Sequence, residues 1–231
     1  MAKTSEASPG LTPPDVTTPD VTTPDVTTPN PHPRGAETVG SGHAGPRPAG
    51  KVALANYDNN WYKPGSRWKI LLWFLLNPVF VNTYLPIPVG LKNSLLRLFG
   101  AKIARGVVIK PAVNIKYPWL LTVENDVWIG EKVWIDNLAP VHIGANACLS
   151  QGAMLLCGNH DFRKPTFDLI VKSITLEEGA WIGAQAVVCP GVTVHSHAVL
   201  AVGSVATKPL EAYGVYQGNP AVFVKKREIN A

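Results

Sequence analysis

The stretch ITLEEGAWIGAQAVVCPGVTVHSHAVLAVGSVA, residues 174–206, repeats with a period of six. An apolar residue recurs at every sixth position without a slip: Leu176, Ile182, Val188, Val194, Leu200 and Ala206. Two positions before each stands a small or branched residue: Ile174, Ala180, Ala186, Val192, Ala198 and Ser204. An amphipathic helix would need a period of about 3.6 and a half-buried strand a period of about 2. The repeat therefore predicts neither an ordinary helix nor a hairpin.

The same period appears further upstream, in three shorter runs. Its apolar positions there are Ile103, Ile109, Ile115, Val123, Ile129, Ile135, Ile143, Leu149 and Leu155. A fixed hexapeptide period is typical of a parallel β-helix, in which three hexapeptides, about 18 residues, close one triangular coil. No coil can bury its inner face alone, so the coils must stack. The sequence thus predicts a mainly β fold, a parallel β-helix of hexapeptide repeats.

Interruptions of the repeat mark candidate binding loops. Slips of two residues fall near 116–121 and 137–141, and a longer gap runs over residues 158–173. Insertions in solenoid proteins become loops on one face, which is often the binding face. The longest insertion opens with the sequence GNHD, which places His160 in a projecting loop.

Residues 1–50 differ in composition from the rest of the chain. They hold ten of the 21 prolines and no aromatic residue, and the unit TPDVT occurs at 18–22 and again at 23–27. Proline at this density blocks helices and sheet ladders, and the segment has too few large apolar residues to offset its ordering entropy. We expect a disordered tail, either inert or carrying a docking motif.

Residues 51–102 are expected to form an N-terminal helical and aromatic region. Ser66 can cap a helix that starts at Arg67, and Asn77-Pro78 should end or kink it. Residues 70–91 carry no charge and are long enough to span a bilayer. Polar residues and prolines break this run, so we favour a buried or interface-lying helix over a span. Residues 68–85 still leave room for peripheral contact with a membrane.

A second helix in this region is expected to end at Gly100, where glycine supplies a C-terminal stop. Leu91, Leu95, Leu98 and Phe99 would share one face of it.

Composition and charge narrow the class of protein. Charged residues make up 16% of the chain, against about 25% in average proteins, which favours a large core or an oligomer interface. The net charge of +5 is too mild and scattered to indicate nucleic-acid binding. Three cysteines without a CxxC pair favour a reducing, intracellular compartment, and we expect no secretory signal because the first 50 residues lack an apolar core segment.

Several strings of the chain resemble one family of enzymes. Over roughly residues 55–226 the chain is similar to the left-handed β-helix, hexapeptide-repeat acyltransferases, and within them to colanic acid biosynthesis acetyltransferases of the WcaF type. The strings that carry the likeness are NYDNNWYKPGS (56–66), LLRLFGAKI (95–103), VWIDNLAPVHIG (133–144), CGNHDFRKPTFDLI (157–170), GAWIGAQAVVCPGVTV (179–194), VGSVATK (202–208) and GNPA (218–221).

The resemblance implies a left-handed β-helix over residues 103–231 that assembles as a homotrimer, with each cleft between two subunits. It implies acetyl-CoA as donor, no metal, and a sugar or oligosaccharide hydroxyl in exopolysaccharide or cell-envelope biosynthesis as acceptor. The reaction would take place in the cytoplasm, with room for contact at the inner face of the membrane.

His160 is the candidate general base. A free imidazole titrates near pH 6.5, so a histidine can take a proton from a hydroxyl at neutral pH. The matching histidine of the family has this role, although an ordinary loop histidine is the alternative. Asp136, Asn137 and Asp161 are candidates for contact with the acceptor, or else turn residues that satisfy backbone groups. Trp181 matches a family tryptophan that lines the active site.

Coenzyme A needs a narrow groove with exposed backbone amides, which small residues permit. By resemblance this groove is lined by Gly183, Ala184, Val202, Gly203 and Ser204, with Thr207 and Lys208 near the nucleotide end. Lys225 and its two basic neighbours, Lys226 and Arg227, could meet phosphates as cations, or could form a solvated basic tail.

Two rival functions remain on the same scaffold. One is a zinc-dependent, carbonic-anhydrase-like enzyme, which would need three converging histidines that the sequence does not display. The other is a non-catalytic trimeric scaffold. Within the acyltransferase reading, an acyl-cysteine route through Cys157 is conceivable, but the repeat explains this residue as packing.

Overall fold

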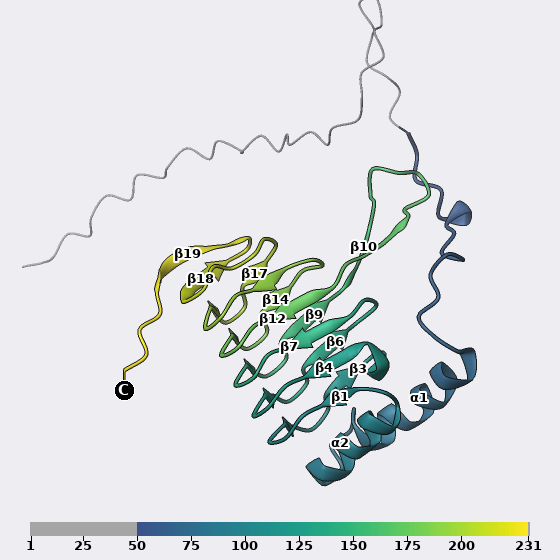
Figure 1. Ribbon diagram of the computed structural model, residues 1–231. Coiled ribbons are helices and arrows are strands. Elements are labelled where there is room, and N and C mark those ends of the chain that lie inside the picture. Colours follow the sequence, from purple (N-terminus) through teal and green to yellow (C-terminus); the bar gives the residue numbers. More distant parts are fainter. Residues whose placement is uncertain (1–49, 231) are drawn as a thin grey trace, which may run out of the picture. The chain divides into compact units, whose positions relative to one another are not determined.

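The computed structural model describes residues 50–230. The proline-rich tail expected over residues 1–50 therefore lies outside the described residues, apart from Gly50. The described chain begins with a short turn, η1 (Leu54–Asn56), and two helices, α1 (Arg67–Phe80) and α2 (Val89–Leu98). A stack of short strands follows, with one further turn, η2 (Pro118–Leu120), between the first two coils (Figure 1).

The strands form three parallel sheets, one for each side of a triangular coil. Sheet A holds β1 (Lys102–Ile103), β4 (Leu121–Val123), β7 (Val141–Ile143), β12 (Ile174–Leu176) and β15 (Thr193–Val194). Sheet B holds β2 (Val108–Ile109), β5 (Trp128–Ile129), β8 (Cys148–Leu149), β13 (Trp181–Ile182), β16 (Val199–Leu200) and β18 (Gly214–Gly218), with β19 (Ala221–Lys226) antiparallel at its edge. Sheet C holds β3 (Asn114–Ile115), β6 (Trp134–Asp136), β9 (Met154–Leu156), β14 (Val187–Val188) and β17 (Val205–Ala206).

The hexapeptide positions fill the inside of the stack. Each large apolar residue pairs in register with its equivalent one coil later, as Ile182 does with Leu149 on one side and Leu200 on the other. Successive hexapeptide residues lie on successive sheets, so the interior holds three columns. Their members are Ile103, Val123, Ile143, Leu176 and Val194 in sheet A, Ile109, Ile129, Leu149, Ile182 and Leu200 in sheet B, and Ile115, Ile135, Leu155, Val188 and Ala206 in sheet C; all are buried. The predicted fold class, a hexapeptide-repeat β-helix preceded by a helical segment, is confirmed.

The corners use glycine for close approach as well as for backbone conformation. A Cβ on Gly183 would lie 2.6 Å from the backbone nitrogen of Val202 in the next coil, so only glycine fits there. The left-handed conformation falls two residues later, at Gln185, and on Gly203 one coil on. The tight spacing of the coils therefore decides which corner positions must lack a side chain.

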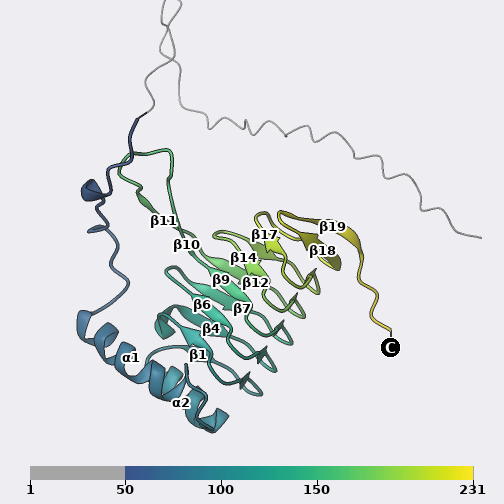
Figure 2. The same cartoon turned by 180° about the vertical axis from the view of Figure 1, so that it is seen from behind.

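The two helices cover the first coil of the stack (Figures 1 and 2). Within the sheets, N–H groups of one coil donate to carbonyls of the following coil, as Val108 does to Val127. Strand carbonyls of the first coil that face away from the second therefore have no preceding coil to bond them. Helix side chains donate to them instead: Trp73 to Ile115, Asn93 to Val107, Arg97 to Ile103 and Lys92 to Lys110. The helices thus close an edge that would otherwise be open to pairing with another chain.

This edge explains which face of α2 is buried. Leu98 is 79% exposed and Leu91 48% exposed, while Lys92, Asn93 and Leu96 are buried. The buried polar side chains supply the donors that the carbonyl edge requires, and hydrophobic spacing alone does not indicate such a need. The expected stop at Gly100 agrees with its left-handed φ of 94° directly after the helix.

The sequence predicted that Asn77-Pro78 would end or kink this helix, and α1 does not end there. It includes Pro78 and continues to Phe80. The helix ends only two residues later, so the missing proline N–H costs a single backbone bond, and the last turn leads into the fully buried Val81. Within residues 50–230 neither α1 nor any other helix reaches the length and hydropathy that crossing a bilayer requires.

Candidate active site

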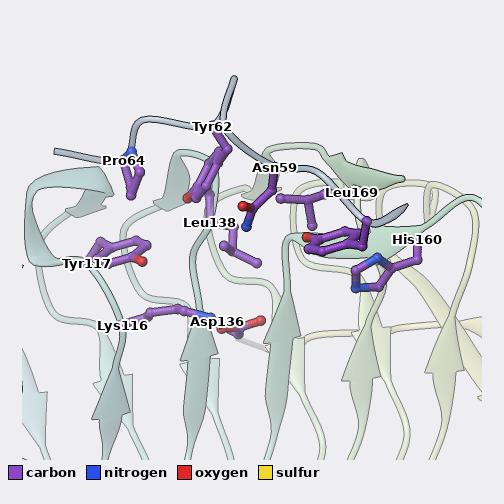
Figure 3. Close-up of a pocket in the computed structure, with 11 residues that line it drawn as sticks. Asn59, Tyr62, Pro64, Lys116, Tyr117, Asp136, Leu138, His160 and Leu169 are labelled. Atoms are coloured by element: carbon purple, nitrogen blue, oxygen red, sulfur yellow. Dashed lines mark hydrogen bonds and ion pairs between the residues drawn. The ribbon is translucent and has the colours of Figure 1, made fainter. Parts of the chain in front are cut away.

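A cleft of about 550 Å³ opens where the strands of sheet C end (Figure 3). Its floor is formed by residues at or just after the ends of successive strands of this sheet, Lys116, Asp136 and Gly158. His160 and Leu169 line it from the hairpin of β10 (Gly158–His160) and β11 (Leu169–Val171). This hairpin is the longest interruption of the repeat, so the insertion does carry the candidate base to a cleft.

A segment before α1, which we call the strap (residues 53–64), crosses over the cleft. It contributes Tyr57, Asn59, Tyr62 and Pro64 to the lining (Figure 3). The strap is bonded at three points. Ala53 N–H donates to the Pro165 carbonyl at 2.8 Å, the Tyr62 hydroxyl donates to the Leu138 carbonyl at 2.6 Å, and the Trp119 indole donates to the Pro64 carbonyl at 2.6 Å.

The imidazole of His160 is held with one nitrogen free for chemistry. Its Nδ1 lies 2.8 Å from the carbonyl oxygen of Phe167, and its ring stacks on the Phe167 ring at 4.5 Å between centroids. A carbonyl oxygen only accepts, so Nδ1 carries the proton and Nε2 of the neutral ring keeps its lone pair. The Tyr57 ring lies 5.6 Å away in a tilted arrangement. This geometry suits a group that accepts a proton through Nε2.

Asp136 and Lys116 form an ion pair in the floor of the cleft, with 2.8 Å between Nζ and Oδ1. Both side chains are partly exposed to the cleft, so their remaining donors and acceptors can reach a bound hydroxyl. Burial, together with the neighbouring Tyr117 and Asp136, raises the pKa of Tyr62 well above its usual range. Tyr62 therefore stays a neutral hydroxyl that bridges the strap and the floor.

The other two candidates for acceptor contact do not line this cleft. Asn137 is fully buried, and its amide pairs with both backbone groups of Tyr117, at 2.6 and 2.9 Å. Asn137 therefore satisfies backbone groups, which was the alternative to acceptor contact. Asp161 turns to Arg163, whose side chain is 3.1 Å away and holds the pKa of the Asp161 carboxyl below its usual value.

Trp181 lies at a second cleft of about 560 Å³, on the outside of sheet B. The cleft is lined also by Val199, Val215 and the basic run from Lys225 to Arg227. The Trp181 indole donates to the Ser150 hydroxyl at 2.9 Å. Within one chain this tryptophan does not share a cleft with His160, and Lys225 lies beside it.

The remaining residues expected to bind coenzyme A follow the corner between sheets B and C. Gly183 and Ala184 lie one coil below Val202 and Gly203, and the Gly203 N–H donates to the Ala184 carbonyl at 2.9 Å. Val202 is 68% exposed, whereas the Ser204 side chain is buried and its hydroxyl accepts from Gly218 N–H. Thr207 and Lys208 are exposed just after β17. The structure thus gathers these residues on one corner, where Gly183 and Ser204 are buried and the others keep exposed surface.

The two halves of the expected site lie on different corners of the coil. The His160 hairpin leaves the stack between sheet C and sheet A, after β9 and before β12. Gly183 lies between sheet B and sheet C, after β13 and before β14. One chain therefore does not bring the histidine and this row of corner residues together.

Sequence reasoning missed the strap residues Tyr57, Asn59 and Tyr62, and also Lys116 and Phe167. The string NYDNNWYKPGS was noted for its family likeness, but nothing in it indicates contact with a loop about 100 residues later. Phe167 is linked to His160 only by the hairpin. No period or motif marks either contact.

The acyl-cysteine route through Cys157 and a metal site were the two chemical alternatives to a histidine base. Cys157 is fully buried, and burial raises the pKa of its thiol to about 11, so it is protonated at neutral pH. Among residues 50–230 no three His, Cys, Asp or Glu side chains are grouped so that they could hold a metal ion.

Known proteins share the sequence pattern and the fold of this chain. No protein-family model matches the chain. WcaF of Escherichia coli strain K12, whose assigned activity is that of a colanic acid biosynthesis acetyltransferase, is 35% identical over 166 residues, which cover 72% of this chain and 91% of that protein. The galactoside O-acetyltransferase of the same strain is 27% identical over 149 residues, 63% of this chain and 72% of the relative. A hexapeptide-repeat acetyltransferase of Vibrio cholerae solved with acetyl-CoA superposes with a TM-score of 0.61 at 20% identity, over 71% of this chain and 87% of that one.

The stacked coils and the sequence relatives define a hexapeptide-repeat acetyltransferase. Within that class, the chain belongs to the WcaF-type family of colanic acid biosynthesis acetyltransferases.

Proposed function

We propose that this chain transfers the acetyl group of acetyl-CoA to a sugar hydroxyl in the synthesis of an exopolysaccharide or another cell-envelope glycan. The observation that carries the proposal is the free Nε2 of His160, whose ring the Phe167 carbonyl holds through Nδ1. The same cleft presents a carboxylate and an ammonium group. The kinship with acetyltransferases of colanic acid and of galactosides favours a sugar as the acceptor.

The reaction is a direct transfer. His160 Nε2 takes the proton of the acceptor hydroxyl as its oxygen attacks the thioester carbonyl carbon. A backbone N–H at a coil corner holds the oxyanion. The carbon–sulfur bond then breaks, the imidazolium returns its proton to the departing thiolate of coenzyme A, and the acetyl ester remains on the sugar. Asp136 and Lys116 would orient the acceptor through its other hydroxyls.

The proposed active unit is a homotrimer with each site between two copies. The hairpin of one copy would supply His160, and the corner at Gly183 and Val202 of its neighbour would supply the groove for coenzyme A. The separation of these groups on different corners of one chain supports a shared site, as does the low charge content of the sequence. We assign the reaction to the cytoplasm because acetyl-CoA is a large polyanion that does not cross a bilayer unaided.

The direct test is turnover of acetyl-CoA by the purified full chain with a panel of sugars, sugar nucleotides and oligosaccharides. Free thiol release reports transfer, and mass spectrometry identifies the ester. His160→Ala should lower kcat by about 10²–10⁴-fold, the usual contribution of a general base. The matched control is His142→Ala, since His142 pairs with Glu124 at 3.1 Å outside the cleft and should leave turnover unchanged. Full turnover by His160→Ala would refute His160 as the base, whereas absence of turnover in the wild type would favour the scaffold alternative.

Mixed trimers test the shared site. His160→Ala and Val202→Glu should each be inactive alone, the first for lack of a base and the second for a blocked groove. Co-expressed in one cell, they should regain activity, because some interfaces then join an intact hairpin to an intact corner. No recovery in mixed trimers of verified composition would contradict a site built by two copies. A zinc content that tracks activity would instead support the zinc-dependent alternative.

A further inference from the structure

The outer face of α1 is apolar and uncovered. We define it by Trp68, Leu71, Leu72, Leu75 and Val79, which follow one another at helical spacing. These side chains are 79%, 51%, 50%, 62% and 47% exposed, respectively. The opposite side of the helix packs on the first coil through the buried Trp73 and Asn77. Large apolar side chains gathered on one helix face mark an interaction surface rather than scattered exposure.

The segment of the chain that contains this face carries charge of one sign. Residues 59–123, which contain both helices and the whole first coil, include nine lysines and arginines and no aspartate or glutamate. The rest of the chain holds 12 lysines and arginines and all 16 acidic residues, an excess of four negative charges. The cations exposed in this acid-free segment are Lys63, Arg67, Arg97, Lys102, Arg105 and Lys110. The positive charge of the protein is therefore concentrated in the segment that contains the apolar helix.

This combination indicates which partner the face accepts. An apolar helix face bordered by lysine and arginine is the composition of helices that lie in the headgroup region of a membrane. Anionic headgroups attract such cations, and the attraction weakens with salt. Two copies of this face brought together would set the like charges of two acid-free segments against each other, which disfavours self-association.

We propose that the outer face of α1 docks on an anionic lipid surface, with the helix lying in the plane of the membrane. The apolar side chains enter the headgroup boundary, and exposed cations of the same segment, such as Lys63 and Arg67, meet the lipid phosphates. Docking also concerns the candidate active site. Phe74 of α1 lines a small cleft of about 270 Å³ together with Asn77, Lys116 and Asp136, and the last two also form the floor of the main cleft. A docked chain therefore holds its main cleft beside the lipid surface, and, if the proposed function is right, an acceptor anchored in that surface lies within reach.

Sedimentation of the full chain with vesicles tests the proposal. Vesicles of phosphatidylglycerol and phosphatidylethanolamine should carry the protein into the pellet at low salt, and phosphatidylcholine vesicles should not. The double variant Leu71→Glu/Leu75→Glu should weaken binding at least ten-fold. The matched control is Val222→Glu/Val224→Glu, which adds the same charge at two exposed positions of β19 and should bind within two-fold of the wild type.

Three outcomes would overturn the docking proposal. Wild-type protein that stays in solution with anionic vesicles refutes lipid docking, as does a double variant that binds like the wild type. If Leu71→Glu/Leu75→Glu instead lowers the molecular mass in solution, the face is an interface between copies. Turnover of a water-soluble sugar should be unchanged in the double variant. Absence of turnover in the wild type, with vesicle binding intact, would refute the proposed function and leave the docking inference standing.

Discussion

Replacing Ile182 with alanine should lower the free energy of unfolding by about 3–4 kcal/mol. Ile182 is fully buried in the sheet B column, between Leu149 and Leu200. The change removes three carbon atoms, worth about 2.4 kcal/mol at about 0.8 kcal/mol each. The cavity left in a close-packed interior adds to this, and buried isoleucine-to-alanine changes fall within about 2–5 kcal/mol. The neighbouring coils cannot close the gap, because their backbones are held in register by the ladder on both sides.

The assay is urea unfolding followed by circular dichroism at one fixed protein concentration, since assembly would make stability depend on concentration. The control is Val202→Ala in the same coil stack, 68% exposed, which should stay within about 0.5 kcal/mol of the wild type. If Ile182→Ala is as stable as the wild type, or if Val202→Ala is equally destabilising, the stacked interior does not carry the fold as argued.

Three further predictions test the site and the corners. His160→Asn keeps a donor for the Phe167 carbonyl but has no base, so kcat should fall about 10²–10⁴-fold while the melting temperature stays unchanged; His160→Gln, whose amide lies further out, should melt lower. Gly183→Ala places a Cβ against backbone of the next coil and should lower the free energy of unfolding in urea more than Gly203→Ala does. The Cβ of Gly203→Ala meets nothing within 4 Å, so this change costs only the left-handed φ, about 1–2 kcal/mol. Equal effects would contradict the close approach. Cys157, fully buried and with its thiol pKa raised to about 11, should resist alkylation at pH 8 until urea unfolds the chain. Mass spectrometry that detects alkylated Cys157 in the native protein would contradict this.

The capping of the first coil shows how a buried polar residue can be required rather than tolerated. Lys92 is 2% exposed, and burial lowers its pKa. Its Nζ donates to the Lys110 carbonyl at 3.1 Å, at the carbonyl edge that no preceding coil covers. Asn93 and Arg97 serve the same edge. A solenoid needs a cap at each end, and here polar side chains of a helix complete it.

The sequence by itself determined the β-helix. Side chains such as Ile182 and Leu200 recur at a fixed spacing, and local geometry turns that spacing into stacked coils whatever lies elsewhere in the chain. It also placed His160 in a projecting loop, because an insertion has no other place in a solenoid. Hydrophobic spacing does not indicate that α2 buries Lys92 and Asn93 and leaves Leu91 and Leu98 exposed, since the helix packs against a polar backbone edge.

Only the tertiary structure decided what surrounds the histidine. The strap reaches a hairpin about 100 residues later through Tyr57 and the Leu138 carbonyl through Tyr62. The Phe167 carbonyl selects the nitrogen of His160 that keeps its lone pair. These contacts join segments distant in sequence, and their geometry depends on where two loops meet above the stack. A periodic pattern encodes how each residue sits relative to its own coil. It holds no information on which separate segments come together at a corner, and at this cleft that meeting sets the chemistry.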